Sequence, residues 1–219
     1  MNEAPRPFYV TTDSGQIRGW RVGAGADVIA LSGLTLAAET IALRLAQSCS
    51  RHRITVFESP GVGGSSEHEA RTLSEVARAL VDAARASGVE ARALIACDLA
   101  AALAPPVAAA LGVAPENIFL LGAGAARALA RHAIAPPDPT PRSDGTHLVA
   151  LWSFLRDRHV LEPDDPTQAA RSGEPLPSPR DLDAALTAFA VRPLRYAELW
   201  ATLLAAPPPL DMAREFGSM

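Results

Sequence analysis

The 219-residue chain contains no lysine, so all 20 of its basic residues are arginine. This absence excludes mechanisms that need a Schiff-base lysine or the lysine of a P-loop. Cysteine is scarce as well: the two residues are Cys49 and Cys97, and neither belongs to a CxxC or Cys/His pattern typical of a zinc site. We therefore expect no metal and no cofactor.

The sequence also lacks a basic stripe and a long apolar run. Its formal net charge is −4, which argues against a nucleic-acid partner. No apolar stretch reaches the roughly 18 residues that span a bilayer, and residues 1–7 are polar and contain prolines, unlike a signal peptide. We expect a cytoplasmic protein without a membrane partner, and its 48% of hydrophobic residues are enough for one good core.

Short apolar runs alternate with amphipathic segments between residues 26 and 121, after a hairpin pattern at 8–12 and 16–22. Parallel strands need crossover helices, so this alternation predicts an α/β fold with a doubly wound, mostly parallel sheet. The expected strands are 26–31, 53–57, 93–96 and 117–121, and the expected helices are 37–48, 72–87 and one from about residue 99.

The second half of the chain has a different pattern. A proline-rich connector at 136–142 is followed by helical patterns at 146–158 and 181–204. We divide the chain into a core at 1–124, a mostly helical lid at 125–206 and a C-terminal tail at 207–219.

The order of these features resembles the α/β-hydrolase superfamily. The segment 58–65 reads ESPGVGGS, close to the acidic residue and Pro-Gly-x-Gly-x-Ser that end one strand in that family. Residues 96–100 read ACDLA and align with the Gly-x-Ser-x-Gly nucleophile elbow. Ser32 and Gly33 stand where the family has His-Gly, and residues 144–148, DGTHL, are similar to the entry of its lid.

The resemblance places Asp98 at the nucleophile position, as in the epoxide hydrolase and haloalkane dehalogenase branches. It implies an oxyanion hole from the backbone N–H groups of Leu34 and Leu99. His147 is the histidine that could approach from the lid, although a structural role suits it better. Trp152 is a candidate pocket residue, with core packing as the alternative reading.

Each candidate has a simpler alternative. Asp98 could be an ordinary helix N-cap, because aspartate is preferred there. Cys97 should point away from the pocket as a small buried thiol. The other four histidines should lie at the surface: His52, His68, His132 and His159.

The family places its acid and its histidine after strands for which this sequence has no counterpart, so the predicted sheet lacks the C-terminal strands. The strand at 117–121 would then be an exposed edge. The C-terminal segment, a second copy or a partner chain supplying the missing strands could cover it. We expect a homo-oligomer formed through this edge.

Without a paired histidine, ester hydrolysis is not the expected chemistry. A lone buried Asp98 suits an acid, base or nucleophile in a non-hydrolytic reaction on a small apolar substrate, plausible in bacterial specialised metabolism. The alternative is an inactive homologue that binds a small molecule or completes a partner protein. Burial of Asp98 in an apolar site, rather than its exposure as a cap, would favour the first hypothesis.

Overall fold

A computed structural model describes residues 4–158, 177–206 and 214–216. Its centre is one sheet in the order β1-β2-β4-β3-β5-β6-β7. β1 and β2 form an antiparallel hairpin, β2 pairs antiparallel with β4, and the remaining neighbours are parallel. The strands are β1 (Arg6–Thr12), β2 (Gly15–Val22), β3 (Ala26–Leu31), β4 (His52–Phe57), β5 (Ala93–Cys97), β6 (Ile118–Leu121) and β7 (Arg214–Phe216).

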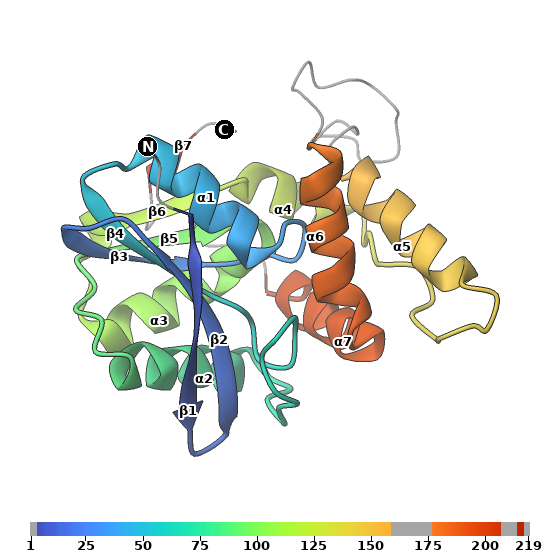
Figure 1. Ribbon diagram of the computed structural model, residues 1–219, viewed down its shortest axis with the longest axis horizontal. Coiled ribbons are helices and arrows are strands. Elements are labelled where there is room, and N and C mark those ends of the chain that lie inside the picture. Colours follow the sequence, from blue (N-terminus) through green and yellow to red (C-terminus); the bar gives the residue numbers. More distant parts are fainter. Residues whose placement is uncertain (1–3, 159–176, 207–213, 217–219) are drawn as a thin grey trace.

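Helices cover both faces of the sheet, as the alternating pattern predicts (Figure 1). Helix α1 (Ala38–Ser48) packs on one face, while α2 (Leu73–Ala86) and α3 (Ala104–Leu111) pack on the other. The central strands are mostly apolar where both of their faces are buried, with Leu94 and Ala96 fully enclosed in β5. The doubly wound α/β fold is therefore confirmed.

The helix after β5 differs from the continuous helix typical of the resembled family. A 3₁₀ segment, η1 (Asp98–Leu103), comes first, and α3 begins only at Ala104. Pro105 and Pro106 lie in the first turn of α3, where proline does not cost an intrahelical hydrogen bond. The two prolines therefore set where α3 starts.

The described residues of the lid form four helices, and the single helix expected at 181–204 is two helices in the structure. The helical pattern at 181–204 forms α6 (Pro179–Ala190) and α7 (Pro193–Leu204), separated at Val191 and Arg192. Proline at position 193 disfavours a helical conformation for the residue before it, so the chain turns and α7 starts anew. The others are α4 (Ala123–Arg131) and α5 (Thr146–Asp157).

The strand expected at 117–121 is not the edge of the sheet. β7 pairs with it in parallel, with Phe119 opposite Arg214 and Leu121 opposite Phe216. Of the three ways to cover this strand, the structure shows the C-terminal segment of the same chain. We based the expected homo-oligomer on an open edge at this strand, and β7 covers that edge. The homo-oligomer stays a prediction.

Candidate functional site

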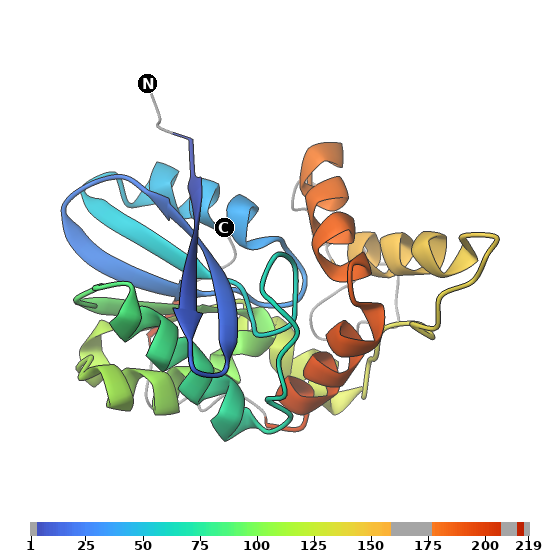
Figure 2. The same ribbon diagram turned by 60° about the horizontal axis from the view of Figure 1, so that its bottom comes forward.

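The carboxyl ends of four parallel strands, β4, β3, β5 and β6, converge beneath the lid. Loops leave β3 and β4 there, η1 starts after β5, and α4 starts after β6. Helix α7 lies across these strand ends and contacts η1 (Figure 2). The crevice outside the carboxyl ends of strands is where open α/β sheets bind ligands.

Asp98 occupies the turn between β5 and η1 in a strained conformation. Its φ is +47°, a left-handed value that is uncommon for a residue with a side chain. It is not the N-cap, because Cys97 holds that position and makes no side-chain cap hydrogen bond. The helix-cap alternative is thus wrong, and the strained turn is the backbone geometry that an elbow requires.

Two glycines make room for the Asp98 carboxyl group. A Cβ at Gly33 would lie 2.8 Å from Asp98 Oδ2, and a Cβ at Gly122 would lie 2.7 Å from Oδ1. Gly122 also has a φ of +72°, so both space and backbone conformation favour glycine there. Asp98 is only partly exposed to solvent. Its carboxyl group lies between Gly33, in the loop after β3, and Gly122, directly after β6.

Burial raises the pKa of Asp98 to about 6. A hydrogen bond to the carboxylate lowers the pKa, but the effect of burial is larger. That bond comes from the Thr35 hydroxyl, which donates to Oδ2 in a short contact. A carboxyl group with this pKa changes its protonation state near neutral pH, which is what acid–base chemistry requires. Thr35 and Gly122 are site residues that sequence reasoning missed. The sequence Gly-Ala-Gly at 122–124, directly after β6, could have indicated this site, because a glycine at the end of a strand often allows another group to approach the backbone closely.

Tyr196 of α7 closes the site from the lid side. It is 1% exposed, and its hydroxyl donates to the carbonyl oxygen of Leu34 at 2.8 Å. Burial raises the pKa of Tyr196 well above its usual value, and the negative charge of Asp98 acts in the same direction. The phenol therefore stays protonated beside the carboxyl group.

The residues predicted to form the oxyanion hole or the pocket wall, Leu34, Leu99 and Ser32, lie near Asp98 but differ in their surroundings. Leu99 is buried, and its N–H is in the first turn of η1, where helix amides lack intrahelical partners. Leu34 is buried below Tyr196. Ser32 is turned into the sheet, where its hydroxyl donates to the Phe57 carbonyl at 3.0 Å.

His147 and Trp152 lie on α5. The Nδ1 atom of His147 accepts a hydrogen bond from the backbone of Arg142 at 3.1 Å, and its ring shares a small hollow with Tyr196. Trp152 is half-buried, and the guanidinium of Arg156 lies 5.3 Å from its ring centre. Phe154, two residues after Trp152 on α5, packs edge-on against Trp200. This contact supports core packing for Phe154 and Trp200.

Cys97 is buried among the residues of the α1 face of the sheet; burial raises the pKa of its thiol, and the charge of Asp98 acts in the same direction. This agrees with an inert thiol. His52 and His132 are exposed as expected, and His159 lies outside the described residues. The surface assignment of His68 is wrong, because it is only 6% exposed.

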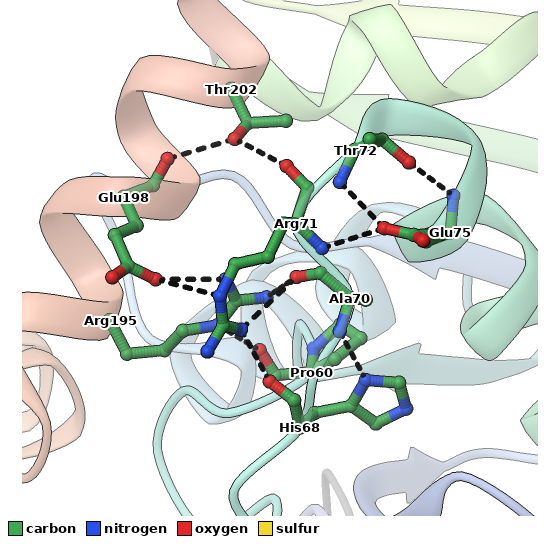
Figure 3. A network of polar contacts seen from close by, with 9 residues as sticks. All are labelled: Pro60, His68, Ala70, Arg71, Thr72, Glu75, Arg195, Glu198 and Thr202. Atoms are coloured by element: carbon green, nitrogen blue, oxygen red, sulfur yellow. Dashed lines mark hydrogen bonds and ion pairs between the residues drawn. The ribbon is translucent and has the colours of Figure 1, made fainter.

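His68 belongs to a polar network that joins the core to α7 (Figure 3). Its Nδ1 accepts from the Ala70 amide at 3.0 Å, and its buried Nε2 has no hydrogen-bond partner among the residues that the structure describes. The buried guanidinium of Arg195 donates to the carbonyl groups of Pro60 and Ala70. The charged residues around His68 in 67–71 are typical of a surface segment, which is why the sequence predicted exposure. The sequence does not show that a helix more than 100 residues later covers this segment.

A second buried charge holds the loop after β4. Glu58 is 4% exposed and accepts hydrogen bonds from the side chains of Arg18 and Trp20 and from the Gly64 amide. The acidic residue quoted for the family resemblance is therefore a loop anchor here.

Within residues 4–158, 177–206 and 214–216, no group of three or more His, Cys, Asp or Glu side chains is arranged to hold a metal ion. In the same residues, no helix combines the length and hydropathy of a membrane-spanning segment.

Known structures with a similar fold were found, whereas no family model and no curated protein matches the chain. A protein assigned as an epoxide hydrolase from Pseudomonas aeruginosa has a TM-score of 0.65 at 18% identity, over 92% of this chain and 70% of its own. A membrane phospholipase A has a TM-score of 0.63 at 18% identity, over 98% and 69%. A protein assigned as a lipase from Acinetobacter baumannii has a TM-score of 0.63 at 11% identity, over 92% and 66%.

The chain thus spans about two thirds of the length of the structures it matches. At these identities the likeness concerns architecture, and it agrees with the sheet order and the strained turn at Asp98. The chain has the α/β-hydrolase fold.

Proposed function

We propose that this chain is an α/β-hydrolase-like enzyme in which Asp98 moves a proton on a bound small molecule, in a non-hydrolytic reaction such as an isomerisation, cyclisation or dehydration. The observation that carries the proposal is the position of Asp98. Its carboxyl group is held at a strained turn, at the ligand-binding end of the sheet, with a pKa raised to about 6 by burial. Backbone strain of this kind is concentrated at functional sites.

Proton transfer suits this carboxyl group better than covalent catalysis. A nucleophilic aspartate forms an ester that an activated water must hydrolyse. His147, the candidate base, has its Nδ1 engaged by the Arg142 backbone. A carboxyl group that titrates near neutral pH can instead both donate and accept a proton within one catalytic cycle.

The apolar surroundings support an organic substrate. Leu34, Leu99 and Tyr196 are each at most 2% exposed and belong to the same core cluster beside Asp98. A site of this kind binds apolar groups and uses a few polar atoms to orient them.

The experiment compares the native protein with Asp98→Asn on a panel of p-nitrophenyl esters, epoxides and isomerisable hydroxy compounds. We expect little p-nitrophenol release, and turnover of a non-ester substrate that titrates near pH 6 and falls at least 100-fold in Asp98→Asn. Asp13→Asn, in the exposed turn between β1 and β2, is the matched control and should retain the native rate.

Two outcomes would contradict the proposal. Unchanged turnover in Asp98→Asn would remove Asp98 from the chemistry. An ester of Asp98 trapped with substrate and detected by mass spectrometry would assign the nucleophilic role instead. Ligand binding without any turnover would favour the inactive, ligand-binding homologue.

A further inference from the structure

Arg158, directly after α5, holds a charge that the described part of the chain leaves without a partner. Its Nε and Nη1 atoms are buried and make no hydrogen bond to any described residue. The guanidinium lies 4.9 Å from the ring centre of Phe154, and burial lowers the pKa of Arg158. Buried N–H donors are normally satisfied, and a charged donor left unpaired is costly.

Among the described residues, the acidic side chain next to Arg158 in the sequence does not meet this need. Asp157 lies next to Arg158 in the sequence, but Oδ1 of its carboxylate accepts from the Arg156 guanidinium at 2.7 and 2.9 Å. Arg158 as a whole is only half-buried, but its two buried nitrogens need an acceptor, and this need indicates an anion that completes the site.

Arg158 and Asp98 lie at the two ends of one series of contacts. The Arg158 guanidinium lies over the Phe154 ring, and at the other end the Tyr196 hydroxyl donates to the carbonyl of Leu34, next to Thr35, which donates to Asp98. The positive charge of Arg158 lowers the pKa of Tyr196, while the negative charge of Asp98 raises it. Phe154 packs against Trp200, one turn beyond Tyr196 on α7, which brings the end of α5 to the same helix. The rings of Phe154, Trp200 and Tyr196 therefore form a continuous series of contacts from Arg158 toward the Asp98 site.

We propose that Arg158 binds the carboxylate of the substrate, so that the ligand is an organic carboxylic acid whose apolar body lies along these rings toward Asp98. A single negative charge balances Arg158, whereas a doubly charged phosphate would leave excess negative charge near Asp98. Charge-assisted hydrogen bonds to the two free nitrogens would orient the ligand. This inference rests on the proposed function, because it names the substrate class of the same site.

The test measures binding of octanoate and of neutral octanamide, which has a similar length, to the full chain at pH 7.5 by isothermal titration calorimetry. We expect the native protein to bind octanoate at least 10-fold more tightly than octanamide. Arg158→Gln should lose that preference, and Arg158→Lys should restore part of it. Arg156→Gln is the matched control from the same region of α5, because Arg156 is already paired with Asp157.

Equal affinity of the native protein for the two probes would overturn the inference, as would a preference for octanoate that survives in Arg158→Gln. If circular dichroism shows that Arg158→Gln does not fold, the native comparison and Arg158→Lys decide. Asp98→Asn should still prefer octanoate. Absence of a carboxylate preference in the native protein would therefore refute the role of Arg158, whereas unchanged turnover in Asp98→Asn would refute the proposed function alone.

Discussion

Asp98 shows how one residue can be poised for chemistry at a cost to stability. It combines a left-handed backbone conformation with a buried carboxyl group, and each feature is unfavourable in itself. Gly33 and Gly122 leave the space, and Thr35 supplies the one hydrogen bond that favours the charged form. A residue selected for stability alone would not occupy this position.

The pKa of Asp98 predicts a pH-dependent gain in stability on Asp98→Asn. The unfolded carboxyl group loses its proton near pH 4, whereas the folded one keeps it until about pH 6. The native protein therefore loses up to about 3 kcal/mol as pH rises through this window, and asparagine does not titrate. We expect Asp98→Asn to raise Tm by roughly 5–10 °C at pH 7.5 and far less at pH 4, measured by differential scanning calorimetry.

Asp13→Asn controls for the loss of one negative charge at the surface and should leave Tm nearly unchanged at both pH values. A Tm for Asp98→Asn equal to the native value at pH 7.5 would mean that the folded protein does not destabilise the charged carboxylate.

At the scale of elements, the loop between β4 and α2 determines how the lid meets the core. The Glu58 carboxylate ties the start of this loop to β2 through Arg18, and Arg195 of α7 ties its Pro60 carbonyl to the lid. Gly63 has a φ of +60°, and a Cβ there would lie 2.6 Å from Glu58 Oε2. The glycines of 58–65 therefore allow the chain to fold tightly around a buried carboxylate.

Removing this anchor should be strongly destabilising. Glu58→Ala leaves the Arg18 guanidinium, the Trp20 indole and the Gly64 amide without their acceptor. We expect the free energy of unfolding to fall by roughly 3 kcal/mol, since breaking a buried pair leaves an uncompensated charge. Urea denaturation at pH 7.5 measures the change.

Glu67→Ala, at an exposed position in the same loop, is the control and should change the free energy of unfolding by less than about 0.5 kcal/mol. A loss of under 1 kcal/mol in Glu58→Ala would show that the loop is held by packing instead of by this carboxylate.

At the scale of the whole molecule, the buried His68 lowers the free energy of unfolding at acidic pH. Burial lowers its pKa, and the charges of Arg195 and Arg71 act in the same direction. The folded ring therefore stays neutral at a pH where the unfolded ring has begun to bind a proton, near pH 6.5. Stability is full above this value and is lost as pH falls through the folded pKa of His68.

His68→Asn tests this directly, because its side-chain oxygen can still accept from the Ala70 amide two residues on. We expect the variant to lose less free energy of unfolding than the native protein between pH 7.5 and pH 5.5, measured by urea denaturation at both values. The exposed His52→Asn should keep the native pH dependence. An unchanged pH dependence in His68→Asn would assign the acid sensitivity to other groups.

Sequence alone determined the order of strands and helices from β1 to β6 and the position of Asp98 in the turn after β5. These follow from local rules, because alternation, capping and proline geometry act over a few neighbouring residues. The side chains of Thr72 and Glu75, for example, form a capping box at the start of α2, where the expected helix 72–87 begins.

Only the tertiary structure decided which groups meet. Tyr196 reaches Leu34 across 162 positions, Thr35 reaches Asp98 across 63, and the C-terminal segment covers β6. The same packing buries His68 and sets the pKa of Asp98, since both depend on what lies above the strand ends. Burial and electrostatic coupling are properties of three-dimensional neighbours, and no local pattern encodes them.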